Sequence, residues 1–457
     1  MRNIAVILAG GSGSRLGNDT PKQFLKLAGK MVIEHTIEVF ENAEQIDEIC
    51  IVSRIDYIER VQELVVLKNY HKVKRILAGG KERYYSSLAA INAYTEECNL
   101  IFHDAVRPLV NERIINDCIE ALQSYKAVDV AIDTTDTIIQ VDENHCIKSI
   151  PLRSELRNGQ TPQCFRRSTI AEAYRHALQD PNFRTTDDCG VVRKYMPNEP
   201  VYVVTGEQFN MKLTHIEDLF LLDKLFQLKN IELSQKGLSP YTTQILSKKV
   251  LVVFGGSYGI GADIVRLARE CGCHVYSFSR SENQVDVTDK VAVQQALQSV
   301  YDKEGRIDAV VNTAGVLYKE PFATMAESTI QSSIDVNLLG VIHVAQASYP
   351  YLKETHGALL FYTSSSYTRG RMMYSLYSAT KAAIVNFVQA IAEEWSECNI
   401  RVNCINPERT KTPMRTRNFG NEPEDTLLPA EEVAIASLNT IFSKFTGEVV
   451  DVRIKKY

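Results

Sequence analysis

Two glycine-rich segments followed by polar residues carry the strongest chemical signals in the sequence. The first, LAGGSGSRLG, places Gly10, Gly11, Gly13 and Arg15 directly after the apolar run 4–8. Glycines let backbone N–H groups approach phosphate oxygens, and a nest of such donors binds an anion. The GK[ST] ending of a Walker A loop is missing. The segment therefore predicts a nucleotide phosphate site of another kind, and a tight strand-to-helix turn is the alternative.

Two further charged residues strengthen the phosphate interpretation. Lys22, in PKQF, adds a second cation near the loop that holds Arg15. Fixed cations stabilise the charge that develops on phosphorus oxygens during nucleotidyl transfer. Asp104, in HDAVRP, follows the apolar run 100–102 and is a natural ligand for Mg²⁺ shared with phosphates. The alternative for Asp104 is a helix cap with a salt bridge to Arg107.

The second glycine-rich segment, GGSYGIG, follows the apolar run 250–254 and predicts a dinucleotide site. The next strand, 275–278, is followed by Arg280, which suits a 2′-phosphate and favours NADP over NAD. The residues expected to hold this cofactor are Gly255, Ser257, Gly259, Ile260, Gly261, Arg280, Asp286, Val287, Asn312, Ala314 and Gly315.

A tyrosine and a lysine four residues apart predict carbonyl chemistry. Tyr377 and Lys381 share one side of a helix, and Ser364 and Asn337 precede them. A nearby ammonium is expected to lower the pKa of the phenol, which then protonates a carbonyl oxygen while hydride reaches the carbon. Ser364 would orient the carbonyl, although the adjacent Ser365 leaves that assignment open.

The segment RTKTPMRTR follows the last predicted strand of the active-site region and is strongly basic. Residues 409–417 hold four cations, and we expect Arg409 and Lys411 to bind an anionic substrate. Cations beside a carbonyl site favour a phosphorylated or carboxylated substrate. A solvated loop without a ligand is the alternative.

The elements that must position these residues alternate along the chain. Apolar strand-like runs at 48–52, 100–102, 128–132, 309–312, 358–362 and 400–405 alternate with helical patterns. This alternation predicts an α/β fold with two consecutive doubly wound, mainly parallel sheets. We expect a first domain at 1–230, closed by a helix over 214–229, then a linker at 231–247 and a second domain at 248–457.

Composition narrows the possible partners. The chain has 457 residues and a net charge of −5, so no global field draws it onto nucleic acid. No apolar run approaches the length of a membrane span. The ten cysteines show no CxxC pair, which predicts reduced thiols and a cytoplasmic enzyme.

The motifs of the first half also carry a family resemblance. LAGGSGSRLG, PKQF, AGGKER, HDAVRP, QTPQ, TDD and NMKLT occur in the order typical of cytidylyltransferases that act on methylerythritol phosphate or ribitol 5-phosphate. The resemblance implies that Arg15 and Lys22 stabilise the transition state and that Asp104 holds Mg²⁺. It further implies binding of CTP and the acceptor alditol phosphate by Gly79, Gly80, Arg83, Ser86, Arg153, Thr186, Asp187 and Lys212.

The second half resembles the short-chain dehydrogenase/reductase family over about residues 247–457. The resemblance implies a Rossmann-type fold and a Tyr377, Lys381, Ser364 and Asn337 active site, with Asn337 holding a water in the proton relay. Pro407-Glu408 departs from the family's usual Pro-Gly. We therefore expect an unusual substrate lid.

The two halves together resemble bifunctional enzymes of capsule synthesis that make CDP-ribitol. This implies reduction of ribulose 5-phosphate with NADPH and then cytidylyl transfer from CTP, in a homodimer. One alternative keeps both reactions but changes the acceptor to methylerythritol phosphate or another alditol phosphate. Another treats the second half as a nucleotide-sensing or dimerisation module without turnover.

Overall fold

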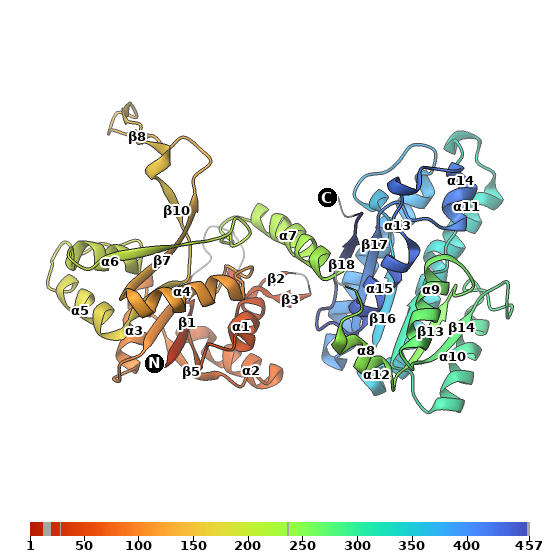
Figure 1. The fold of residues 1–457 in the computed structure, drawn as a ribbon, viewed down its shortest axis with the longest axis horizontal. Helices are drawn as coiled ribbons and strands as arrows, with labels where there is room; N and C mark the ends of the chain where they lie inside the picture. Colours follow the sequence, from red (N-terminus) through yellow and green to blue (C-terminus); the bar gives the residue numbers. More distant parts are fainter. Residues whose placement is uncertain (12–19, 28, 235–236, 455–457) are drawn as a thin grey trace. The chain divides into compact units, whose positions relative to one another are not determined.

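The chain forms two compact units, Met1–Leu222 and Asp223–Tyr457, in a computed structural model (Figure 1). The structure describes residues 1–11, 20–27, 29–234 and 237–454. Each unit consists of a sheet with helices on both faces, and the predicted fold class is confirmed.

The first unit contains an eight-stranded mixed sheet in which four neighbouring strands lie parallel. These are β1 (Asn3–Ala9), β4 (Glu48–Ser53), β5 (Val73–Ala78) and β6 (Asn99–Asp104). The sheet continues through β11 (Gln163–Arg166), β7 (Ala127–Asp133), β10 (Arg157–Gly159) and β12 (Val201–Thr205). β11 lies antiparallel between β6 and β7. Because β1 is buried on both faces, it consists almost entirely of apolar residues.

Helices cover both faces of this sheet. One face packs against α1 (Val32–Asn42), α2 (Ile58–Lys68) and α4 (Glu112–Ser124). The other packs against α3 (Arg83–Ala93), α5 (Arg167–Ala177) and α6 (Asp188–Tyr195). The short pair β2 (Lys26–Leu27) and β3 (Lys30–Met31) precedes α1. The three-layer arrangement leaves the carboxyl ends of the parallel strands at one edge.

A second hairpin stands apart from this core. β8 (Gln140–Val141) pairs with β9 (Ile147–Ser149), and every residue of both strands is exposed. The hairpin extends from the end of the sheet that carries β7 and β10 (Figure 1). We call residues 134–159 the arm.

The second unit has a six-stranded, wholly parallel sheet. Its strands, in spatial order, are β14 (His274–Phe278), β13 (Val250–Phe254), β15 (Ala309–Asn312), β16 (Ala358–Tyr362), β17 (Arg401–Pro407) and β18 (Val449–Val452). α10 (Lys290–Glu304), α12 (Gly340–Thr355) and α13 (Ser375–Glu394) pack on one face. α9 (Gly259–Glu270) and α15 (Ala430–Ile441) pack on the other, and α11 (Glu327–Ile334) precedes α12.

Two helices follow the first sheet along the chain and precede the second. α7 spans Glu217–Ser234, and α8 spans Pro240–Leu246 within the predicted linker. α8 forms because the Ser239 side chain accepts the N–H of Thr242 at 2.9 Å and Pro240 suits the first helical turn. Within the described ranges, no helix has both the length and the apolar character to cross a membrane. All ten cysteines carry free thiols.

Candidate active sites

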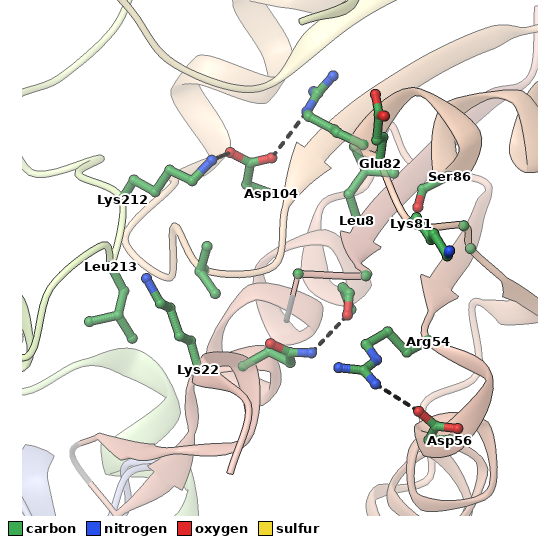
Figure 2. A pocket seen from close by; sticks show the side chains of 18 of the residues that line it. Leu8, Lys22, Arg54, Asp56, Lys81, Glu82, Ser86, Asp104, Lys212 and Leu213 are labelled. Atoms are coloured by element: carbon green, nitrogen blue, oxygen red, sulfur yellow. Dashed lines mark hydrogen bonds and ion pairs between the residues drawn. The ribbon is translucent and has the colours of Figure 1, made fainter. Parts of the chain in front are cut away.

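A cavity of about 710 Å³ opens where the parallel strands of the first unit end. Parallel strands place their carboxyl ends at one edge of a sheet, where ligands usually bind. Figure 2 shows the cavity, which is lined by Leu8 of β1, Arg54 directly after β4 and Asp104 of β6. Its lining includes Gly10, Gly11, Lys22, Arg54, Asp56, Gly79, Gly80, Lys81, Glu82, Arg83, Ser86, Asp104, Lys212 and Thr214. Nine of the sequence-predicted residues thus meet in one place: Gly10, Gly11, Lys22, Gly79, Gly80, Arg83, Ser86, Asp104 and Lys212.

Asp104 is the most strongly paired acid of this cavity. Its Oδ2 lies 2.8 Å from Lys212 Nζ and 3.8 Å from Arg107 Nε, and its Oδ1 lies 3.6 Å from Arg83 Nε. Burial opposes ionisation, but the cations of Lys212 and Arg83 outweigh it and hold the pKa of Asp104 well below its usual range. Asp104 is therefore an anion that bridges cations from three segments.

Arg83 is fixed by a second acid that the sequence did not single out. Asp188 is fully buried and accepts Arg83 Nη1 at 2.5 Å and the Tyr174 hydroxyl at 2.6 Å. Burial alone lowers the pKa of Arg83, but Asp188 and Asp104 together raise it. The predicted neighbour Asp187 instead caps α6, with Oδ1 accepting the Gly190 N–H at 2.8 Å. Asp187 and Asp188 are adjacent, so the sequence alone did not indicate which of the two side chains is buried.

Two glycines of the cavity leave room for the Ser86 side chain. A Cβ on Gly79 would lie 2.4 Å from Ser86 Oγ, and one on Gly10 would lie 3.0 Å from the same atom. Lys22 donates to the Thr214 carbonyl oxygen. Gly13 and Arg15 lie outside the described residues.

Three predicted acceptor-binding residues do not line this cavity. Arg153 is exposed in the arm, and its Nη1 donates to the Thr135 carbonyl oxygen at 3.2 Å. Thr186 is exposed, and Asp187 caps α6. In contrast, Arg54 lines the cavity although the sequence reasoning missed it. Its position directly after the apolar strand β4 was the signal that could have found it.

The donors around Asp104 suit one kind of metal site. In the described ranges, no group of three or more His, Cys, Asp or Glu side chains converges as a metal cage would. Mg²⁺ commonly uses one or two carboxylates and takes its other ligands from phosphates and water. Asp104 fits such a shared site.

The second unit brings the predicted carbonyl-reducing residues together. Tyr377 and Lys381 lie one turn apart on α13, with Lys381 Nζ 5.5 Å from the Tyr377 ring centroid. Lys381 Nζ also donates to the Tyr362 carbonyl oxygen at 2.8 Å. Ser364 lies close enough to Tyr377 to lower the pKa of the phenol. Ser364 is therefore the serine that acts on the phenol.

Asn337 joins this group through an irregular helical turn. It lies in a π-helical segment, Asp335–Leu339, and exchanges two hydrogen bonds of 2.8 Å with the backbone of Val316. A Cβ on Gly315 would lie 3.3 Å from Asn337 Oδ1 and 3.8 Å from Lys381 Nζ. The Asn337 amide therefore lies near Lys381, and a side chain at position 315 would crowd the amide.

Burial controls the acid–base character of this site. Burial lowers the pKa of Lys381 to about 8. Burial also raises the pKa of Tyr377 to about 12, against the opposing hydrogen bond from Ser364. The predicted lowering of the Tyr377 pKa is therefore wrong for the protein alone, because the effect of burial outweighs that of the neighbouring polar and charged groups. The phenol remains a proton donor.

A backbone cradle beside these residues fits a dinucleotide. Gly255 has φ +79° and Gly259 has φ +60°, values that favour glycine. A Cβ on Gly261 would lie 2.4 Å from the Gly255 carbonyl oxygen. The buried Nδ2 of Asn312 has no partner within the described structure. Close approach at the start of α9 and an unsatisfied donor both suit a bound pyrophosphate nucleotide.

The expected adenosine end of the cradle is more open. The Arg280 side chain is 76% exposed and lies 3.9 Å from Asp286 Oδ2. The Ser281 hydroxyl donates to Ser257 Oγ at 3.1 Å, and Val287 is buried. Ala314 donates its N–H to Asn312 Oδ1 at 3.0 Å. An exposed cation beside hydroxyls is a suitable receptor for a phosphate group.

Comparisons with known proteins match each half of the chain to a family. The family model for 2-C-methyl-D-erythritol 4-phosphate cytidylyltransferase matches residues 3–227, and that for short chain dehydrogenase matches residues 249–423. The 2-C-methyl-D-erythritol 4-phosphate cytidylyltransferase of Thermobifida fusca is 42% identical over 50% of this chain and 94% of its own. The crystal structure of 4-diphosphocytidyl-2C-methyl-D-erythritolsynthase from Anaerococcus prevotii covers 50% of this chain and 99% of its own, with 30% identity and a TM-score of 0.44.

One relative matches both halves at once. The bifunctional ribulose 5-phosphate reductase/CDP-ribitol pyrophosphorylase Bcs1 of Haemophilus influenzae is 49% identical over 99% of this chain and 96% of its own. The similarity therefore includes the order of the two domains as well as each domain separately. The chain belongs to the family of bifunctional ribulose 5-phosphate reductase/CDP-ribitol pyrophosphorylases, enzymes with a cytidylyltransferase domain followed by a short-chain reductase domain.

Proposed function

We propose that this enzyme reduces ribulose 5-phosphate with NADPH to ribitol 5-phosphate and then converts ribitol 5-phosphate and CTP to CDP-ribitol and pyrophosphate. The observation that carries the proposal is the presence, in one chain, of the Asp104 cavity and of the Tyr377 site. The similarity to the Haemophilus influenzae enzyme over nearly the whole chain supports the choice of substrates.

In the first unit, an oxygen of the acceptor phosphate attacks the α-phosphorus of CTP. A new P–O bond forms, the bond to the β-phosphate oxygen breaks, and pyrophosphate leaves. Lys22 and Arg15 stabilise the charge on the phosphorus, while Gly10, Gly11 and Gly13 offer backbone N–H groups. Gly79, Gly80 and Ser86 hold the cytidine, and Lys212 binds the acceptor phosphate. Asp104 would hold Mg²⁺, which would neutralise charge on the triphosphate.

In the second unit, bound NADPH supplies the hydride. The Tyr377 phenol donates its proton to the C2 carbonyl oxygen, and Ser364 orients that oxygen by a hydrogen bond. The Lys381 ammonium stabilises the phenolate that remains. Asn337 holds the water through which the phenol recovers a proton. The ketone becomes the secondary alcohol of ribitol 5-phosphate.

Product analysis tests the whole proposal. The full chain is incubated with ribulose 5-phosphate, NADPH, CTP and MgCl₂, and we expect CDP-ribitol, NADP⁺ and pyrophosphate in equal amounts. A second incubation offers CTP with ribitol 5-phosphate, methylerythritol phosphate or another alditol phosphate. Faster pyrophosphate release with methylerythritol phosphate would contradict the acceptor. No NADPH oxidation would instead favour a reductase unit without turnover.

Three finer proposals accompany this function. Arg280 favours NADP(H) over NAD(H), since it lies where a 2′-phosphate would come. The exposed apolar residues of the arm, among them Ile147 and Leu152, favour a homodimer in which the arm is covered. Free thiols and nucleotide substrates favour a cytoplasmic enzyme that supplies CDP-ribitol for capsule synthesis.

A further inference from the structure

Residues 409–424 of the second unit, which we call the lid, contain two ion pairs in different surroundings. α14 spans Pro413–Phe419, and its Arg415 forms a two-pronged pair with Glu422, with N···O distances of 2.7 and 2.8 Å. Only 21% of the Arg415 side chain and 19% of the Glu422 side chain are exposed. The pair of Lys411 with Glu424 is mostly exposed on both sides. Arg415 therefore holds a carboxylate in a shielded, fixed geometry.

Aromatic contacts connect Arg415 with the catalytic phenol. The Arg415 Cζ lies 3.8 Å from the Phe419 ring centroid. Phe419 meets the Tyr374 ring edge-on at 6.0 Å, and Tyr374 meets the Tyr377 ring at 6.2 Å. The charge of Arg415 also acts on the Tyr377 phenol. The guanidinium thus lies in the neighbourhood of the group that protonates the substrate.

Further cations surround the carboxylate that Arg415 holds. Lys319 Nζ lies 4.7 Å from the Phe419 ring centroid, on the ring that also contacts Arg415. The hydrogen bonds from Arg415 lower the pKa of Glu422 against the opposing effect of burial, and Arg409 and Lys319 lower it further. One carboxylate therefore faces three positive charges, an excess that an anion with more charge would balance better.

We propose that Arg415 and Lys319 bind the phosphate group of the reductase substrate and that this phosphate displaces the Glu422 carboxylate. A guanidinium accepts phosphate in the same two-pronged geometry as carboxylate. A phosphate monoester carries about −1.5 to −2 charges at pH 7, against −1 for a carboxylate. The aromatic contacts bring this phosphate site to the side of the carbonyl site at Tyr377. The inference rests on the proposed reduction of a sugar phosphate and names the residues that select it.

A purely structural role for the pair predicts the opposite result. If Glu422 only fastens α14, its neutralisation loosens the lid and weakens substrate binding. If Glu422 competes with the phosphate, its neutralisation strengthens binding. The sign of the change in KM therefore separates the two roles, and a misfolded variant cannot imitate a gain in affinity.

The test measures NADPH oxidation with ribulose 5-phosphate and with unphosphorylated ribulose in the full chain. We expect Glu422→Gln to lower KM for ribulose 5-phosphate several-fold. The matched control, Glu424→Gln, removes the same charge from the exposed pair with Lys411, which this proposal, unlike the sequence-based expectation, places outside the phosphate site, and it leaves KM unchanged. Arg415→Met raises KM for ribulose 5-phosphate by about ten- to hundredfold but leaves kcat/KM for ribulose nearly unchanged. An unchanged or raised KM in Glu422→Gln overturns the proposal.

Inorganic phosphate provides a readout that does not depend on turnover. Calorimetric titration of the NADP⁺-saturated proteins is expected to show tighter phosphate binding in Glu422→Gln than in Glu424→Gln. If the wild type fails to oxidise NADPH with ribulose 5-phosphate but this difference is present, the proposed substrate is wrong and the phosphate site stands. If turnover occurs and the two variants bind phosphate equally, the phosphate site is refuted.

Discussion

Tyr377 and Lys381 acquire their chemistry from burial. The phenol, with a pKa of about 12, keeps its proton at neutral pH, and the ammonium, with a pKa of about 8, holds its proton less firmly than an exposed lysine. Reduction of a ketone requires a protonated phenol, so the raised pKa favours this direction. The lysine limits the pH range in which the phenolate can be stabilised after proton transfer.

The lowered pKa of Lys381 predicts how the rate of reduction depends on pH. Because Lys381 loses its proton near pH 8, we expect kcat/KM for NADPH-dependent reduction to be level below that pH. It should then fall by up to about tenfold per pH unit above it. Initial rates between pH 6 and 10 measure this profile, and Lys381→Met should lack the break. A wild-type profile that stays level to pH 10 would show that the lysine charge is unimportant.

Removal of the Tyr377 hydroxyl tests the proton donor directly. We expect Tyr377→Phe to slow NADPH oxidation by about 100-fold or more, since no neighbouring group replaces the donated proton. Pyrophosphate release from CTP and ribitol 5-phosphate should be unchanged, because the Asp104 cavity lies in the other unit. Equal NADPH oxidation in the variant and the wild type would refute the assignment.

Arg280 determines the cofactor preference in our interpretation. Its side chain is largely exposed, so substitution should leave the fold intact. We expect Arg280→Asp to lower the ratio of kcat/KM for NADPH to that for NADH by about ten- to hundredfold, the value of charge-assisted hydrogen bonds to a phosphate. Parallel assays with both cofactors measure the ratio. If the ratio does not change, Arg280 does not contact the 2′-phosphate.

At the scale of elements, the end of β6 depends on a neutral histidine. His103 is fully buried, and Nε2 lies 3.1 Å from the Arg107 carbonyl oxygen while Nδ1 lies 3.0 Å from Thr161 Oγ1. Thr161 Oγ1 in turn accepts the Asp104 N–H at 3.2 Å. Burial lowers the pKa of His103 to about 4. The turn that presents Asp104 is therefore held by a histidine that must not be charged.

This network predicts acid sensitivity of the first unit. Between pH 6.5 and 4 the unfolded chain binds a proton at His103 that the folded chain does not, so stability is lost as pH falls through this range. The free energy of unfolding should fall by about 2 kcal/mol between pH 7 and pH 5 through this group. Urea unfolding of wild type and His103→Gln measures it. An identical pH dependence in both proteins would contradict the account.

The helices and strands that could be predicted from the sequence are those that depend on a pattern within one short stretch of residues. The apolar runs before Gly10 and Gly255 form β1 and β13, because long buried parallel strands need continuous apolar residues. The antiparallel strand β11 was not predicted, since its direction depends on pairing with β6 and β7. The π-helical turn at Asn337 was not predicted either, because it depends on packing and not on the local sequence. The pair of Arg83 with Asp188 joins residues 105 positions apart.

At the scale of the whole molecule, each unit contains all the described residues of its own site. The transferase cavity is lined by residues 8–214, whereas the carbonyl site and its lid use residues 312–424. The product of the reductase is the substrate of the transferase, so the two reactions are connected by chemistry.

Self-contained sites predict that two damaged enzymes complement each other. Lys22→Ala should lose pyrophosphate release and keep NADPH oxidation, while Tyr377→Phe should do the reverse. Mixed in equal amounts with ribulose 5-phosphate, NADPH, CTP and MgCl₂, the two variants should make CDP-ribitol after a lag, because ribitol 5-phosphate must accumulate in solution first. Unlabelled ribitol 5-phosphate added to labelled ribulose 5-phosphate should dilute the label in the product. A mixture that stays inactive although each variant keeps its own reaction would mean that the intermediate passes between units of one chain without entering solution.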